Sequence, residues 1–136
     1  MNRLSHALLL LPFLSAPSFA CDWQVSTQVD PMTDKVTCVV SSASAKVSFY
    51  RYGSDRPNVR TASAYVRSGD GLEIRIDENQ AILMGNNAYQ RQKALDELLP
   101  QLKSGKRIRT SFRDVPNHQS GDAPICNLQQ LLNDCS

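Results

Sequence analysis

Four cysteines constrain the fold of this chain more than any other feature of its sequence. They are Cys21, Cys38, Cys126 and Cys135, and the segment before the first of them has the pattern of an export signal. In an oxidising compartment an even number of cysteines predicts disulfide pairs. We therefore expect two disulfides in a small domain.

Residues 1–20 have the three regions of a secretory signal peptide. Arg3 supplies a positive charge, "ALLLLPFL" forms the apolar region, and the small residues of "SFA" lead to cleavage after Ala20. The apolar region is too short to span a bilayer. We expect a single β-rich domain at 21–136, long enough to bury a core of its own.

The predicted signal peptide places the protein in the periplasm, with secretion to the medium as the alternative. A lipid anchor on Cys21 is less favoured, because Ser18, bulky Phe19 and Ala20 depart from the branched and small residues of a lipoprotein signal. Such an anchor would also leave three thiols, an odd number for pairing. We expect no membrane insertion after signal cleavage.

The spacing of the cysteines narrows their pairing. The segment "NLQQLLND" has helical periodicity and separates Cys126 from Cys135 by roughly 13 Å, too far for a disulfide. At the other end, "DWQVSTQ" and "KVTCVVSS" predict a hairpin turning at "DPMTD", whose register faces Cys38 towards Thr27 rather than Cys21. We expect bridges between the C-terminal helix and the N-terminal hairpin, with the partners of each cysteine left open.

Most of the remaining sequence predicts β-strands. In "KVSFYRY", Val47 and Phe49 alternate with Ser48 and Tyr50, as residues on the two faces of a strand do. In "LEIRID" the apolar residues again alternate with charged ones, and "QAILMG" is a short apolar run that predicts a further strand.

One helix is predicted late in the chain, from about Ala88 to Leu99, where apolar residues recur near helical spacing. Pro100 is expected to kink or end it. The predicted fold is mainly β: a small antiparallel β-sandwich or barrel-like domain stapled by disulfides. One helix precedes the penultimate strand, and a short helix ends the chain.

The stretch "KRIRTSFRD" concentrates cations after that helix. As a strand it has a core face and a solvent face, which are Ile108, Thr110 and Phe112 on the first and Arg107, Arg109, Ser111 and Arg113 on the second. We expect ion pairs across the sheet, with Glu73 and Asp77 as partners. The alternative is a site for a phosphate, carboxylate or sugar acid.

The overall charge and the cysteine spacing exclude several functions. The net charge is only +2, so no general attraction to nucleic acid follows, and aromatic residues are not interleaved on the arginine face. No CxxC pattern occurs, and His118 is the only histidine after the signal segment. We expect no nucleic-acid partner, no metal site and no cofactor.

Enzyme motifs are lacking as well. His118 lies in a polar loop rich in proline and glycine, and no GxSxG, HExxH or glycine-rich phosphate loop occurs. Two carboxylate pairs, Asp70 with Asp77 and Asp30 with Asp34, keep an envelope hydrolase acting on cell-wall or saccharide substrates as the alternative function. We expect no catalytic residue, because turn formation explains these aspartates.

Tyrosine and arginine gather in the middle of the chain, a composition typical of protein-binding surfaces. The predicted binding residues are Tyr50, Arg51, Tyr52, Arg56, Arg60, Tyr65 and Arg67. The favoured function is an accessory or inhibitor-like module that recognises another envelope or secreted protein. The sequence specifies no oligomeric state.

Three stretches resemble known families of small periplasmic proteins. "WQVSTQVDPMTD", "LEIRID" and "ALDELLPQLKSGKRIRTSF" are similar to parts of the invasion-associated locus B type and of the VasI-like accessory proteins of type VI secretion. The resemblance implies a compact β-sandwich with a late helix and an accessory role in the envelope. The cysteine pattern departs from both families, and the resemblance supplies no active site.

Overall fold

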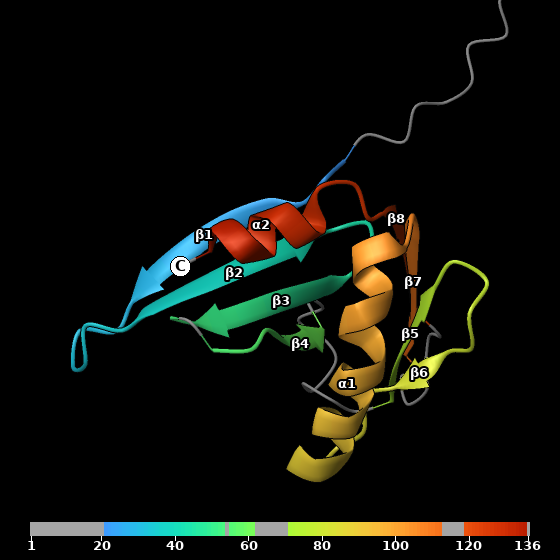
Figure 1. Cartoon of the computed structure of the whole chain (residues 1–136), viewed down its shortest axis with the longest axis horizontal. Helices are drawn as coiled ribbons and strands as arrows, with labels where there is room; N and C mark the ends of the chain where they lie inside the picture. The colour runs from blue at the N-terminus through green and yellow to red at the C-terminus, as the bar shows by residue number, and fades with distance from the viewer. Residues whose placement is uncertain (1–20, 54, 62–70, 113–118, 136) are drawn as a thin grey trace, which may run out of the picture.

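The computed structural model describes residues 21–53, 55–61, 71–112 and 119–135. These residues form two four-stranded antiparallel sheets and two helices (Figure 1). The first sheet has the order β1 (Gln24–Val29), β2 (Val36–Ser42), β3 (Val47–Tyr52) and β4 (Asn58–Thr61). The second has the order β6 (Ile82–Leu83), β5 (Leu72–Ile76), β7 (Arg107–Phe112) and β8 (Ser120–Pro124). The mainly β prediction is confirmed, and the described strands form two separate sheets rather than a closed barrel.

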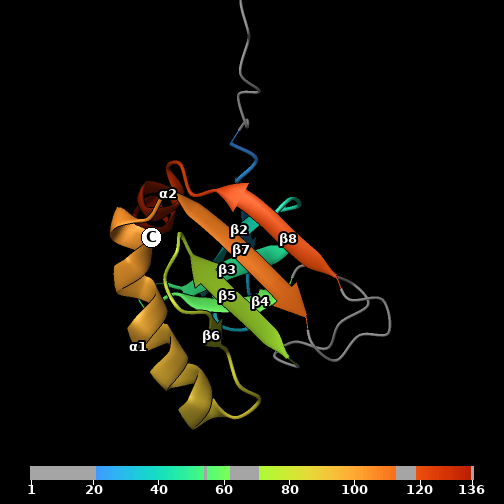
Figure 2. The ribbon, with the colours of Figure 1, turned by 90° about the vertical axis from the view of Figure 1, so that its right-hand side faces the viewer.

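The core lies where the second sheet crosses one end of the first (Figures 1 and 2). Alternate residues of β5 and β7 point into it, as the sequence pattern predicts. Phe49 from β3 and Val40 from β2 are fully buried, together with Ile74 from β5 and Ile108 and Phe112 from β7. The predicted inward direction of the apolar residues in "KVSFYRY" and "LEIRID" is confirmed.

Helix α1 (Ala88–Ser104) packs against β5 and β6 and precedes the penultimate strand, as predicted. It begins with Asn87, whose side chain accepts the Gln90 N–H. The helix does not end at Pro100 but continues to Ser104. Proline costs the backbone one hydrogen bond, and the burial of Leu98 and Leu102 on either side of it offsets that loss. No helix among the described residues is long and apolar enough to cross a membrane.

The two disulfides join the N-terminal hairpin to the C-terminal segment, as expected. Cys21 pairs with Cys126, and Cys38 pairs with Cys135, with Cα atoms 6.1 and 5.6 Å apart. The bridges leave no free cysteine among the described residues. They hold α2 (Leu128–Asp134) over β2, on the same face of the first sheet as the core. Two disulfides indicate an oxidising, extracytoplasmic compartment.

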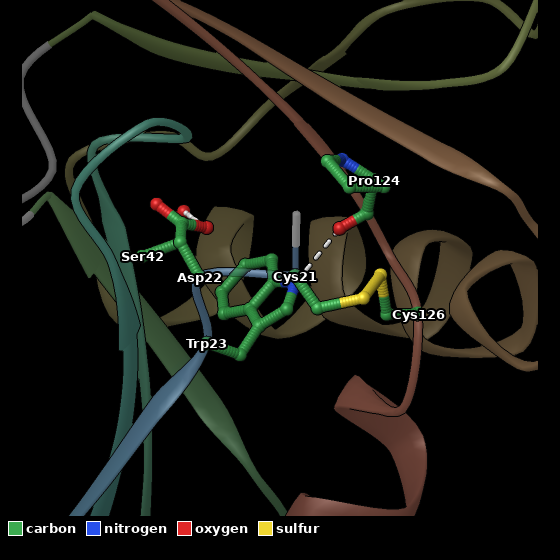
Figure 3. The surroundings of a disulfide bond; sticks show 6 residues. All are labelled: Cys21, Asp22, Trp23, Ser42, Pro124 and Cys126. Carbon is green, nitrogen blue, oxygen red and sulfur yellow. Dashed lines mark hydrogen bonds between the residues drawn. A yellow bond between two sulfur atoms is a disulfide. The ribbon is translucent and has the colours of Figure 1, made fainter. Parts of the chain in front are cut away.

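The N-terminal residues connect the two sheets beside the first disulfide (Figure 3). The Trp23 indole N–H donates to the Pro124 carbonyl oxygen at 2.9 Å, and its ring lies 6.0 Å from that of Phe49. The Asp22 carboxylate accepts the Ser42 hydroxyl at 2.6 Å and the Ser44 backbone N–H at 2.9 Å. This corner therefore holds the start of β1 against both β2 and β8.

The Asp22 carboxylate makes stability depend on pH. Burial by itself raises the pKa of this carboxyl. Hydrogen bonds from the Ser42 hydroxyl and the Ser44 N–H together outweigh that effect, so the pKa of Asp22 lies below its ordinary value. A carboxyl with a lower pKa in the folded state stabilises the fold above its unfolded pKa, and this stabilisation is lost as pH falls below about 4. We expect Asp22→Asn to destabilise the protein at pH 7 and to have a smaller effect at pH 2.5.

Urea unfolding at both pH values measures this difference. Asp55→Asn, which alters an exposed carboxylate in the loop after β3, serves as the matched control. An equal loss of unfolding free energy for Asp22→Asn at the two pH values would contradict the assignment of that stabilisation to the ionised carboxylate.

Candidate binding surface

The outer face of the first sheet carries an aromatic pair with a cation. The alternation of β3 directs Tyr50 and Tyr52 to the face opposite Phe49, and Arg60 reaches the same face from β4. The two tyrosine rings meet edge to face with centroids 5.6 Å apart, and the Arg60 guanidinium lies 5.3 Å from the centroid of Tyr50. We call this group, with its neighbour Asn58, the tyrosine face.

The neighbouring strands place small and medium-sized uncharged side chains beside the tyrosines. In register with Tyr50 lie Asn58 on one side and Val39 on the other, and Ser26 of β1 follows Val39. Among the described residues of β1 to β4, Arg60 is the only charged side chain on this face. Tyrosine, serine, asparagine and arginine together provide rigid contact area and adaptable hydrogen bonds, as in antibody paratopes.

The structure divides the predicted binding residues. One group lies together on the outer sheet face and consists of Tyr50, Tyr52 and Arg60. The other described members contact the two helices. Arg51 points to the opposite face, where its Nη1 donates to the Leu132 carbonyl oxygen of α2 at 3.0 Å. Arg56 forms an ion pair with Asp96 of α1 at 2.6 Å.

The remaining two predicted binding residues, Tyr65 and Arg67, lie outside the described residues. Of the five predicted binding residues that the structure describes, the tyrosine face contains three.

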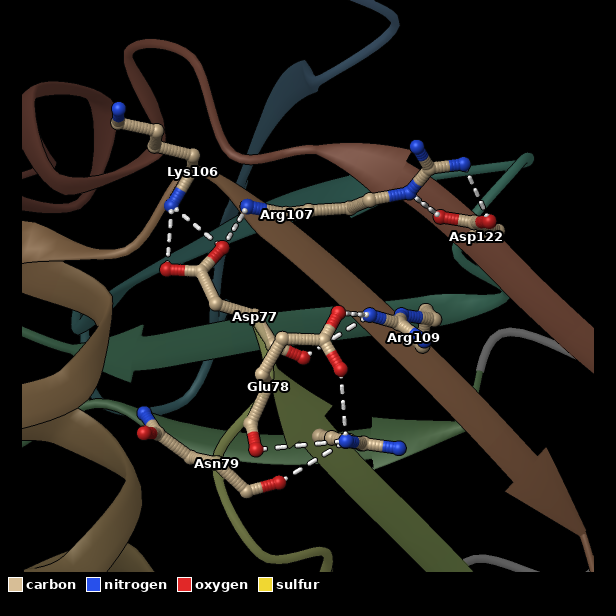
Figure 4. Close-up of polar contacts among 8 residues, drawn as sticks. Asp77, Glu78, Asn79, Lys106, Arg107, Arg109 and Asp122 are labelled. Carbon is tan, nitrogen blue, oxygen red and sulfur yellow. Dashed lines mark hydrogen bonds and ion pairs between the residues drawn. The ribbon is translucent and has the colours of Figure 1, made fainter.

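The cations of β7 form ion pairs on the solvent side of the second sheet (Figure 4). Arg107 binds Asp122 through two hydrogen bonds of 2.6 Å, which lower the pKa of Asp122 and raise that of Arg107. Arg109 lies opposite Arg75 in the register, and Glu78 binds both guanidinium groups, at 2.6 and 2.9 Å.

The prediction that β7 has one buried face and one solvent face is confirmed. Ile108, Thr110 and Phe112 are buried, and Arg113 lies outside the described residues. Asp77 was expected to pair with an arginine side chain, but its carboxylate accepts the backbone N–H groups of Lys106 and Arg107 at 2.8 to 3.2 Å, and Glu78 binds Arg75 and Arg109 instead. Carboxylates hold the arginines, which disfavours the alternative of an anion site.

Two of the carboxylates considered for catalysis, those of Asp30 and Asp77, have structural roles, and Asp34 lies in the turn between β1 and β2, where its backbone N–H donates to the Asp30 carbonyl oxygen at 2.9 Å. Asp30 accepts the Met32 N–H at 2.8 Å within the turn between β1 and β2, and Asp77 anchors the start of β7. Asp70 and His118 lie outside the described residues. In the described part of the chain no three acidic, histidine or cysteine residues gather in a way that could hold a metal.

A groove of about 740 Å³ runs between α1 and residues 80–85, and no sequence pattern indicated it. Its walls combine Leu83 with polar residues of the helix, among them Lys93, Glu97 and Gln101. An Asn79–Gln101 side-chain hydrogen bond of 2.9 Å joins the β5–β6 turn to the helix that forms one wall. Helical periodicity identifies the buried face of α1 but not the polar residues that face a neighbouring loop.

Comparison of the chain with protein-family models, with curated proteins and with solved structures gives no match.

Proposed function

We propose that this protein is a periplasmic accessory module that binds another envelope or secreted protein through the tyrosine face. The observation that carries the proposal is the packed group of Tyr50, Tyr52 and Arg60 on an outer sheet face. The disulfides support an extracytoplasmic site of action. An envelope accessory role is also what the resemblance to the locus B and VasI-like families implies.

The geometry favours a protein partner because the anchors are ordered before binding. Tyr50 and Tyr52 are held by the strand and by each other, so binding freezes little additional side-chain motion. Tyr52 keeps 50% of its surface exposed, which leaves contact area for a partner. Tyrosine and arginine are also the residues enriched among those that dominate binding energies.

The charge of this face indicates the chemistry of the partner. Arg60 is exposed, and its neighbours among the described residues of that sheet face are uncharged. A guanidinium in this setting favours a carboxylate, which it binds in a bidentate manner. We therefore propose a partner whose contact surface presents an aspartate or glutamate beside hydrogen-bonding backbone or hydroxyl groups.

The test is capture from a periplasmic extract, followed by affinity measurement with the purified partner. We expect Tyr52→Ala with Arg60→Ala to weaken binding at least about thirtyfold, since the loss of even one dominant contact costs about 2 kcal/mol or more. Leu83→Ala, at an exposed site on the second sheet, is the matched control and should bind like the wild type.

Equal capture by the double variant and the wild type would refute the tyrosine face as the binding surface. Far-UV circular dichroism and non-reducing mass spectrometry of each variant verify that the sheets and both disulfides are intact.

A further inference from the structure

The strand β1 forms an edge of the first sheet that lacks the usual protection against pairing. All six residues of Gln24–Val29 are exposed, and the strand contains no charge and no proline. Natural edge strands are commonly blocked by lysine, proline or a bulge. On the face shared with α2, Val25 is 47% exposed and Val29 is 61% exposed.

The register shows which backbone groups point to the open edge. The Asp30 N–H donates to the Lys35 carbonyl oxygen at 2.9 Å, one step beyond the Val29–Val36 pair. Hydrogen-bonded and non-hydrogen-bonded pairs alternate along an antiparallel ladder. The backbone N–H and C=O groups of Val25, Thr27 and Val29 therefore point away from β2. In this direction they can form hydrogen bonds with another strand.

The stretch from Val25 to Val29 reads VSTQV and is nearly symmetric about its centre. We propose that a second copy of this chain pairs with it through β1, antiparallel, with the two-fold axis at Thr27. In that register Val25 faces Val29 of the second copy, and Thr27 faces its own counterpart. Cross-strand pairs of these kinds are favourable, and a two-fold interface requires a self-complementary strand of this kind.

The charges at the ends of the strand are compatible with this register. Because the pairing is antiparallel, the charged turns between β1 and β2 of the two copies lie at opposite ends of the interface. Asp30 of one copy is opposite Gln24 of the other, a carboxylate beside an amide. No like charges oppose each other from Gln24 to Asp30.

The helices leave room for the second copy. Two edge strands between β2 and its counterpart place these strands three spacings apart, about 14 Å. A helix over each β2, about 10–12 Å wide, fits beside its counterpart at that distance.

Beside α2 a small apolar hollow of about 120 Å³ opens towards β1, with Val25, Val36 and Leu131 among its walls. In the paired arrangement Val29 of the second copy reaches Val25 at its mouth. The pairing therefore covers both exposed valines of each chain.

Sedimentation equilibrium of the oxidised, exported protein over a wide concentration range tests the proposal. We expect the wild type to form a dimer in a concentration-dependent manner. Val25→Lys with Val29→Lys should raise the dimer dissociation constant at least tenfold, because the new cations face each other across the axis. Val25→Lys with Val29→Glu should restore dimerisation to within threefold of the wild type, because opposite charges then face each other.

Leu83→Lys, on the edge strand β6 of the second sheet, adds a cation away from β1 and should leave the dissociation constant unchanged. A wild type that stays monomeric at every concentration would overturn the proposal, and so would a dimer that tolerates the double lysine. Failure of the lysine–glutamate variant to recover would refute the register centred on Thr27. Circular dichroism confirms that each variant is folded.

Discussion

Replacement of Cys38 and Cys135 together by alanine should lower the free energy of unfolding by about 3–5 kcal/mol. This bridge closes a loop of 97 residues, so its removal restores much conformational freedom to the unfolded chain. Both cysteines are also buried, at 3% and 6% exposure, and the bridge holds α2 on β2. Because small domains are stable by only about 5–15 kcal/mol, this loss is a large share of the total.

Urea unfolding followed by the fluorescence of Trp23, the only tryptophan, measures this effect. The matched comparison is Cys21→Ser with Cys126→Ser, because that bridge closes a loop of similar size, with a separation of 105 residues, but joins two exposed cysteines. We expect a smaller loss there, since little packing is removed. Equal losses of unfolding free energy in the two variants would show that the packing of α2 contributes nothing beyond the effect of loop closure.

Truncation of Phe49 is the second change with a large expected effect. Phe49→Ala should cost about 3–5 kcal/mol, because the side chain is fully buried and its ring packs beside that of Trp23. Loss of the ring opens a cavity in the core where the first sheet meets the second. The midpoint of urea unfolding should fall accordingly.

Phe49→Leu retains most of the apolar volume and is expected to cost about 1.5 kcal/mol or less. Tyr52→Ala, three positions along β3 and on the exposed face, should change stability much less. A cost of Phe49→Ala no larger than that of Tyr52→Ala would contradict the placement of Phe49 in the core.

The tyrosine face shows which features of a binding surface can be predicted from sequence. The alternation in "KVSFYRY" predicts that Tyr50 lies opposite Phe49, and the structure agrees. Proximity in sequence does not group Arg51 or Arg56 with the tyrosines, because one points to α2 and the other pairs with Asp96. Neither α2 nor α1 is near these residues in the sequence. The local sequence pattern therefore cannot predict those contacts.

Short-range periodicity in the amino-acid sequence was enough to predict several features of this fold. Alternating residues specify which side chains of a strand are buried, since every second residue faces the core. An even number of cysteines after a predicted export signal indicates two bridges, and the helix between Cys126 and Cys135 excludes their direct pairing. These inferences need only local geometry.

Other features depend on how segments far apart in the sequence meet, and these became visible in the folded protein alone. The tertiary structure selected Cys126 for Cys21, brought Glu78 between two arginines, and seated Gly121 against Ala45, where a Cβ would meet the backbone of that turn. It also left β1 at an open edge. Each of these outcomes depends on the order and stacking of the strands, which the summed packing of the whole core determines rather than any single stretch of sequence.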